Sequence, residues 1–154
     1  MSDLEKLYQE TILDHHRAPR NAGRLSDATH TAEAHNPLCG DRVHVSLRLG
    51  PLPGAAGPGV LAAHCDAQGC ALCRASGSLL TELVGGQALP QVTAWLRQFL
   101  ELASAAPGAE PTLDEALLGF VAPLLEVRKF PSRRRCVTLS WEALQAALQV
   151  PAPV

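Results

Sequence analysis

The chain makes its most informative turn at Asn36-Pro37-Leu38-Cys39-Gly40-Asp41. Pro37 fixes one backbone angle and Gly40 allows conformations that are costly for every other residue, so the turn is expected to be stiff. It presents a soft thiol, Cys39, and a hard carboxylate, Asp41, close together in the sequence. Thiolates bind zinc and other borderline metals, and a carboxylate can fill a fourth, weaker position. Three sulfurs and one such oxygen would make a tetrahedral zinc site.

The hydrophobic pattern around this turn predicts an α+β fold, with a small three-stranded antiparallel sheet packed against several helices. Residues 30–36 could lead into the turn as a strand, and apolar side chains alternate from Val43 to Leu49 as in a half-buried strand. The proline- and glycine-rich segment 51–59 is expected to be a loop, and residues 60–67 a returning strand. The turn then lies at one end of a three-stranded meander.

Apolar side chains recur at helical spacing in the rest of the chain. The predicted helices cover residues 2–17, 70–84, 91–103, 112–125 and the stretch after Pro131. Ser2-x-x-Glu5 and Thr112-x-x-Glu115 match the capping box, in which two side chains satisfy free N–H groups of the first helical turn. The adjacent His15 and His16 are expected in solvent or at the helix end.

Composition and charge argue against two classes of binding partner, nucleic acids and membranes. The 154 residues suffice for one domain with its own core. A net charge of -2 argues against nucleic acid as an obligatory partner. No apolar run approaches the roughly 20 residues needed to span a bilayer, so no membrane partner is expected. The N-terminus is acidic and polar, unlike a signal peptide, and the protein is predicted to be cytoplasmic.

The five cysteines are the main candidates for chemistry. In the cytoplasm cysteines more often bind metals, react or pack than form disulfides, and the odd number argues against a purely disulfide framework. Cys70 opens one predicted helix and Cys136 lies in the first turn of another, where the helix dipole favours the thiolate. Other interpretations remain open. Cys70-x-x-Cys73 matches a redox or zinc pair, Cys65 could pair with Cys70, and a free cysteine can be a small buried hydrophobe.

Three consecutive arginines, residues 133–135, directly precede Cys136. Cations at the positive end of a helix are unfavourable by about 0.3–1 kcal/mol each. This cost suggests that the arginines hold an anion, stabilise thiolates or meet an acidic partner. The alternative is a solvated charged turn.

Three motifs occur in order along almost the whole chain and resemble those of the U-type iron–sulfur assembly proteins. They comprise residues 7–15 with 19–23 and 36–41, then residues 69–82, and finally residues 130–141. Two features are nearer to the SufU branch than to the IscU branch. Arg135 stands where IscU-type scaffolds have a histidine, and arginine cannot ligate a metal because it stays protonated. SufU-type members also carry an insertion, which is expected here around residues 104–125 of a single domain spanning residues 1–154.

The resemblance implies a zinc ion held by Cys39, Asp41, Cys70 and Cys136. It also implies a SufS-type cysteine desulfurase, a pyridoxal-phosphate enzyme, as partner, with downstream iron–sulfur assembly proteins as recipients. The protein would then be a sulfurtransferase that accepts persulfide sulfur on Cys39, and not a stand-alone enzyme. Asp41 would be the weakest-held ligand, so a partner group could take its share of the zinc and free Cys39 as a nucleophile.

The same residues are compatible with two other functions. The same ligands could assemble a transient iron–sulfur cluster, as a scaffold does, or hold a purely structural zinc ion in a binding module. Cys73 stands where the family commonly has serine and Cys65 where it commonly has an aromatic residue. These extra thiols could allow side reactions, a different metal or a disulfide. Gly77 interrupts the second predicted helix, at a cost of about 1 kcal/mol relative to alanine.

Overall fold

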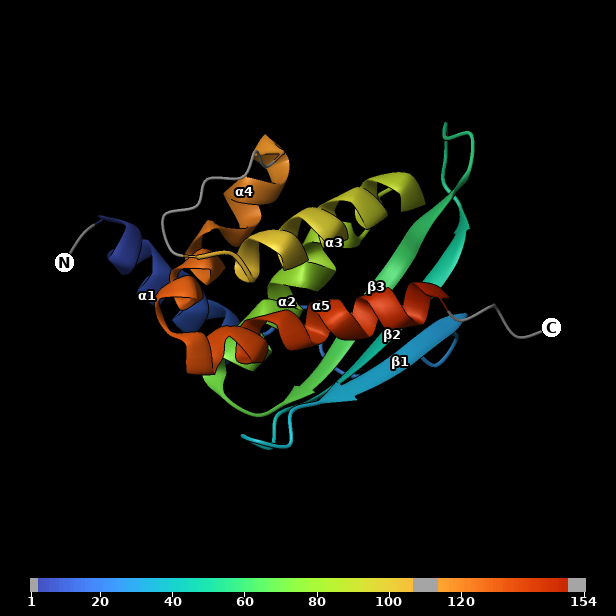
Figure 1. Cartoon of the computed structure of the whole chain (residues 1–154). Helices are drawn as coiled ribbons and strands as arrows, with labels where there is room; N and C mark the ends of the chain where they lie inside the picture. Colours follow the sequence, from blue (N-terminus) through green and yellow to red (C-terminus); the bar gives the residue numbers. More distant parts are fainter. Residues whose placement is uncertain (1–2, 107–113, 150–154) are drawn as a thin grey trace.

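The computed structural model describes residues 3–106 and 114–149. Three antiparallel strands form one sheet, and the helices pack on it (Figure 1). The prediction of an α+β fold with a small antiparallel sheet is confirmed. In chain order the elements are α1 (Asp3–Arg17), β1 (His30–His35), β2 (Arg42–Pro51), β3 (Pro58–Gln68), α2 (Ala71–Val84), α3 (Leu89–Ala103), α4 (Glu115–Val121), the 3-10 helices η1 (Ala122–Lys129) and η2 (Pro131–Arg133), and α5 (Arg134–Gln149).

The sheet is a meander with the strand order β1-β2-β3. Val45 of the central strand lies opposite Ala32 of β1 and Cys65 of β3. Alternate residues of a strand point to opposite faces, so Val43, Val45 and Leu47 share one face and are buried there. The predicted period of two along β2 is therefore real, and it separates a helix-covered inner face from an outer face.

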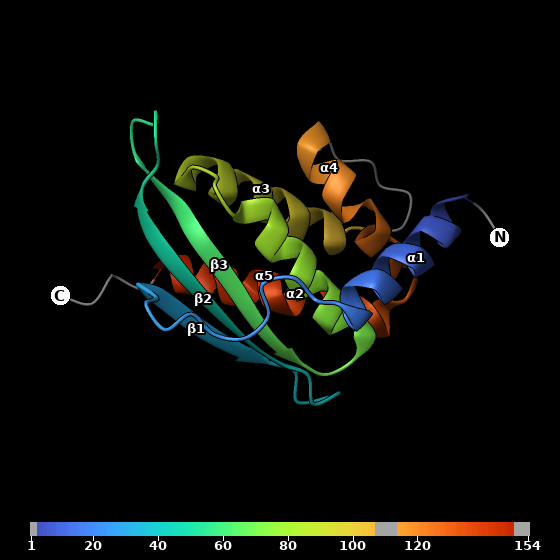
Figure 2. The ribbon, with the colours of Figure 1, turned by 180° about the vertical axis from the view of Figure 1, so that it is seen from behind.

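Two helices cover the inner face. α5 packs on β1 and β2, whereas α2 packs on β3 and also contacts α1 and α5 (Figure 1). Phe99 of α3 stacks on Trp141 of α5 with 3.9 Å between ring centroids, which joins the next helix to this core. Seen from behind, the segment between α1 and β1 runs along the sheet (Figure 2), and Leu25 N donates to Ser46 Oγ there. Within the described ranges, no helix is both long and apolar enough to cross a membrane.

The predicted helix over residues 112–125 is wrong in its extent and in its cap. α4 begins at Glu115, and the Asp114 side chain caps it by accepting a hydrogen bond from Ala116 N. Glu115 is thus the first helical residue and not the third, as the capping box required. The α-helix ends at Val121 and continues as the 3-10 helix η1. Pro123 has no N–H to donate to the carbonyl four residues earlier, which explains the change.

Some expectations concern residues outside the described ranges. Ser2 and Thr112, the first members of the two expected capping boxes, lie there, as do residues 150–154. The expectation of a single domain over residues 1–154 with an insertion around 104–125 stays a prediction.

The two histidines were expected in solvent or at the helix end, and His15 lies in the last turn of α1 but not in solvent. It is 7% exposed, and its Nδ1 lies 2.7 Å from Ser78 Oγ of α2. Its Nε2 lies 3.7 Å from Glu82, but burial dominates and lowers the pKa of His15, as does the nearby Arg20 cation. His15 therefore joins α1 to α2 inside the protein.

Candidate metal centre

The turn between β1 and β2 is held by Asn36, which is 3% exposed. Its N–H donates to Asp41 O at 2.8 Å, its carbonyl accepts from Gly40 N at 2.8 Å, and its side-chain oxygen accepts from Leu38 N at 3.1 Å. Gly40 has a φ of 79°, a left-handed conformation that favours glycine. The stiffness expected from Pro37 and Gly40 thus depends equally on Asn36, a role for which the Asn-Pro pair was a usable signal.

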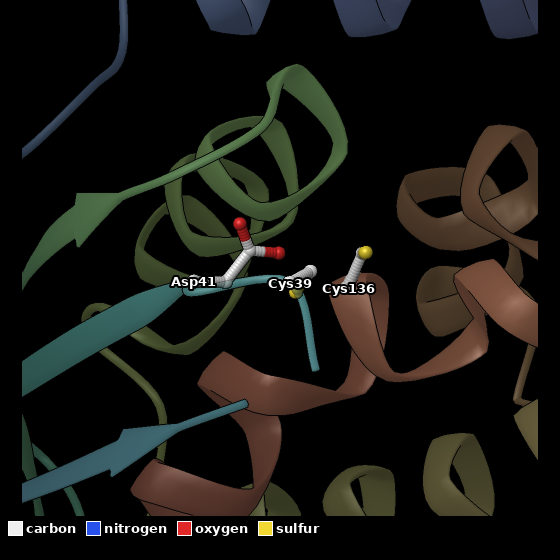
Figure 3. A group of neighbouring side chains, drawn as sticks. All are labelled: Cys39, Asp41 and Cys136. Carbon is white, nitrogen blue, oxygen red and sulfur yellow. The ribbon is translucent and has the colours of Figure 1, made fainter. Parts of the chain in front are cut away.

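Three candidate ligands meet where the strand β2 starts and the helix α5 begins. The Sγ atoms of Cys39 and Cys136 and a carboxylate oxygen of Asp41 all lie within 4.8 Å of one another (Figure 3). Cys70, just before α2, is the fourth predicted ligand, and its Sγ lies 3.5 Å from Asp41 Oδ2. It is not part of the mutually close group. The fold nevertheless brings Cys70 and Cys136, which are far apart in the sequence, to the turn that carries Cys39 and Asp41.

Asp41 lies at the centre of this group and is 2% exposed. Its Oδ1 accepts a hydrogen bond from Cys70 N at 3.0 Å. Burial raises the pKa of Asp41, but this bond and hydrogen bonds from the thiols of Cys39, Cys136 and Cys70 outweigh burial and hold the pKa below its usual value. Three thiols that share one ionised carboxylate are a donor set that suits a borderline dication such as zinc, which would replace the thiol protons.

Gly69 makes room for this carboxylate. Its φ is 153°, and a Cβ at this position would overlap the side-chain carboxylate of Asp41. Any other residue at position 69 would therefore push Asp41 away from Cys70. The role of Gly69 was not predicted, although a glycine directly before a candidate ligand was a signal of close approach.

The candidate ligands differ in how far solvent reaches them. Cys39 is exposed, Cys70 is half-buried and Cys136 is 3% exposed. The prediction that the helix dipole lowers the thiol pKa is wrong for Cys136. Burial raises its pKa, and the charges of Cys70 and Asp41 raise it further. Desolvation and the neighbouring anions both disfavour the ionised thiol, whereas a bound cation would favour it.

The other two cysteines belong to the core. Cys73 is 0% exposed and Cys65 is 5% exposed. Burial raises the pKa of Cys73, and it raises the pKa of Cys65 to about 12. Cys65 packs against the helix α2 at Gly77, where an added Cβ would lie only 2.6 Å from its Sγ. The close packing of α2 on β3 thus explains why glycine stands at position 77. None of the five cysteines forms a disulfide.

The three arginines before Cys136 have different surroundings. Arg134 Nη2 donates to Arg128 O at 3.1 Å, and Arg135 Nε lies 3.6 Å from Glu142 Oε2 on the next turns of α5. Arg133 is exposed at the end of η2. Two of the three side chains therefore have contacts within this part of the chain, and Arg135 points to Glu142 and not to the candidate ligands.

An α+β fold that gathers three cysteines and an aspartate at one end of its sheet defines a class of small metal-handling proteins. Residues 7–137 match the family described as the NifU-like N terminal domain, and the chain belongs to this family. The sequence-based resemblance to U-type iron–sulfur assembly proteins is confirmed.

Several relatives match almost the whole chain, among them two from Bacillus subtilis and Streptococcus pyogenes. The zinc-dependent sulfurtransferase SufU of Bacillus subtilis is 33% identical over 145 residues, which cover 94% of this chain and 90% of that protein. The iron–sulfur cluster assembly scaffold protein IscU of Streptococcus pyogenes is 30% identical and covers 97% of this chain, with 87% of its own length matched. The protein is thus an iron–sulfur cluster assembly protein of the SufU type.

A solved structure supports the fold independently. The crystal structure of an iron–sulfur cluster assembly scaffold protein for the SUF system from Fervidobacterium islandicum superposes with a TM-score of 0.76, covering 94% of this chain and 98% of that one. Only 24% of the residues are identical, so this match speaks for the architecture alone.

Proposed function

We propose that this protein is a zinc-dependent sulfur acceptor, which takes persulfide sulfur from a SufS-type cysteine desulfurase and passes it to iron–sulfur cluster assembly. Cys39, Asp41, Cys70 and Cys136 would hold the zinc ion. The observation that carries the proposal is the gathering of three sulfurs around one buried carboxylate. The name of the Bacillus subtilis relative, a zinc-dependent sulfurtransferase, supports the same function.

A bound zinc ion would supply Lewis acidity, which keeps the thiols ionised without any change in its own oxidation state. The chain provides the rest. Asp41 offers a single ionised oxygen donor among sulfurs, held in place by Cys70 N and by the space at Gly69. Carboxylate oxygen is a harder donor than thiolate, so a basic group of a partner would compete most easily for Asp41's share of the site.

The sulfur transfer would be a thiol–persulfide exchange at Cys39. The Cys39 thiolate attacks the outer sulfur of the partner's cysteine persulfide, and a new S–S bond forms on Cys39. The S–S bond of the partner breaks, and its cysteine leaves as a thiolate that takes up a proton. One persulfide is consumed and one is formed, so no external oxidant or reductant is needed.

Exposure supports the choice of Cys39 as the acceptor. Cys39 is exposed in its stiff turn, whereas Cys136 lies beneath the surface. The neighbouring Leu38 is 94% exposed, so the turn projects its residues outward. A sulfur on a large partner protein could approach Cys39 without unfolding either helix that carries the other thiols.

A scaffold function is the second candidate. It is favoured by the Streptococcus pyogenes relative, which is named a scaffold protein, and it would use the same ligands for a transient iron–sulfur cluster. Both proposals treat residues 1–154 as one U-type domain, with residues 104–125 as an insertion.

Metal analysis combined with persulfide mapping tests the choice. The purified protein is expected to contain one zinc per chain, to stimulate a SufS-type desulfurase, and to carry the added sulfur on Cys39 in mass spectra. Cys39→Ala should abolish stimulation while Cys73→Ser retains it. Stimulation that survives Cys39→Ala would overturn the acceptor assignment. A transferable cluster chromophore after anaerobic reconstitution, blocked by zinc, would favour the scaffold.

A further inference from the structure

Helix α2 carries two buried serines with different partners. Ser76 is 0% exposed, and its hydroxyl donates to Val137 O of α5 at 2.6 Å. The same oxygen accepts from Trp141 Nε1 at 3.0 Å and from Ser140 Oγ at 3.5 Å. A hydroxyl has one proton and two lone pairs, so these three contacts use its whole capacity. Ser76 is therefore fully committed to α5.

Ser78 lies two residues further along α2 and is 3% exposed. Its oxygen accepts from Arg20 N at 2.8 Å and lies 2.7 Å from His15 Nδ1. Both partners belong to α1 or to the segment that follows it. The two serines thus have the same chemistry, the same helix and similar burial, but they connect α2 to opposite neighbours.

The contacts of Ser76 lie next to two candidate ligands. Cys70 stands directly before α2, less than two helical turns from Ser76. Val137, whose carbonyl accepts the hydrogen bond from Ser76, directly follows Cys136 in the first turns of α5. The bond from Ser76 to Val137 therefore links the starts of the two helices that carry Cys70 and Cys136.

We propose that Ser76 is a positioning residue of the metal centre, which fixes the separation of the Cys70 and Cys136 sulfurs by holding α5 against α2. The inference rests on the zinc site of the proposed function. Zinc–sulfur bonds are about 2.3 Å long and metal sites tolerate deviations of only about 0.2 Å. The stacking of Trp141 on Phe99 keeps the indole N–H directed at Ser76, so a single arrangement satisfies all partners.

Ser76→Ala and the matched control Ser78→Ala test this role. Both remove a buried hydroxyl from α2, so both are expected to lower stability. Zinc affinity, measured by competition with a chromophoric chelator, should fall about tenfold or more in Ser76→Ala and stay within about twofold of wild type in Ser78→Ala, since a tenfold change is 1.4 kcal/mol of differential positioning. The cobalt-substituted protein should show a changed ligand-field spectrum only in Ser76→Ala.

Equal losses of zinc affinity in the two variants, or no loss in Ser76→Ala, would overturn the inference. If Ser76→Ala does not fold, Ser76→Cys replaces it, and an intermediate loss of affinity is expected because a thiol is a weaker hydrogen-bond donor. Hydrogen exchange on metal-free protein gives a readout that needs no zinc. Amides of residues 134–139 should exchange faster in Ser76→Ala than in Ser78→Ala. Unchanged exchange of these amides would contradict the inference that Ser76 holds α5 against α2. A wild-type protein that binds no zinc would instead contradict the proposed function.

Discussion

The five cysteines fall into two groups that differ in position and not in chemistry. Cys39, Cys70 and Cys136 lie around Asp41 at the end of the sheet, where solvent reaches Cys39. Cys65 of β3 and Cys73 of α2 are buried in the hydrophobic core. The same side chain is thus a candidate ligand or nucleophile in one region and a small apolar filler in the other.

The difference shows what prepares a thiol for metal chemistry. Around Asp41, the thiols share a fixed anion as their partner, and that anion is itself held by the Cys70 N–H, so the thiol protons can be exchanged for a cation. In the core, Cys65 packs against Gly77, and its thiol stays protonated because burial and the nearby Asp66 charge both disfavour the thiolate. Polar partners and access, more than the helix dipole, separate the two groups.

The largest expected contrast is in alkylation. In metal-free protein near pH 8, iodoacetamide should label Cys39 readily, while Cys65 and Cys73 stay unlabelled until the protein unfolds. Burial raises the pKa of Cys65 from 9.0 to about 12, which lowers its thiolate fraction about a thousandfold at pH 8. Peptide mapping at increasing times measures the rates. Labelling of Cys65 at a rate similar to Cys39 would erase the distinction between the groups.

Removing single thiols should affect zinc retention in only one group. Cys136→Ala is expected to weaken zinc binding on the order of 100-fold, because a binding free energy of about 10–16 kcal/mol is shared among four ligands. Cys73→Ala, a matched substitution in the core, should leave zinc affinity within a few-fold of wild type while lowering the free energy of unfolding. Chelator competition and urea denaturation provide the two measurements. Zinc loss in Cys73→Ala would move Cys73 into the metal group.

The smallest expected effect concerns the packing of Cys65. Gly77→Ala should destabilise the protein by about 1–3 kcal/mol, because the new Cβ would lie 2.6 Å from Cys65 Sγ and force a shift. In a Cys65→Ala background the space is free, and the same substitution should cost far less or stabilise through the better helix propensity of alanine.

Urea denaturation of the four proteins in this double-mutant cycle gives the coupling energy. A coupling near zero would show that Cys65 does not determine the need for glycine at position 77.

Local sequence patterns were sufficient for most of the fold. The alternation along Val43 to Leu49 predicted the central strand, and the turn residues Pro37 and Gly40 predicted its sharp entry. Both ends of the helix α4 were predicted less well than the strands. Asp114 caps that helix in place of the expected box, and Pro123 changes its hydrogen bonding, so two local signals competed there.

The candidate ligands could be named from motifs, but their burial, their pKa values and their contacts with one another could not. The sequence alone left a Cys70–Cys73 pair open beside the packing role favoured for Cys73, and it predicted a lowered pKa for Cys136. In the structure Cys73 packs into the core, and burial raises the pKa of Cys136. His15 likewise looked like a polar helix exit, yet it is buried against Ser78. Burial depends on residues that are distant in the sequence, and no local pattern records it.

The sequence by itself determined the family, the sheet and its helices, and the four residues proposed to hold zinc, because these depend on periodicity and on short motifs. Only the tertiary structure decided which thiol faces solvent, that Asp41 is the common partner of the other three, and that Ser76 ties α5 to α2. These properties arise where β2, α2 and α5 pack together, so they follow from distances between segments and not from the order of residues within any one of them.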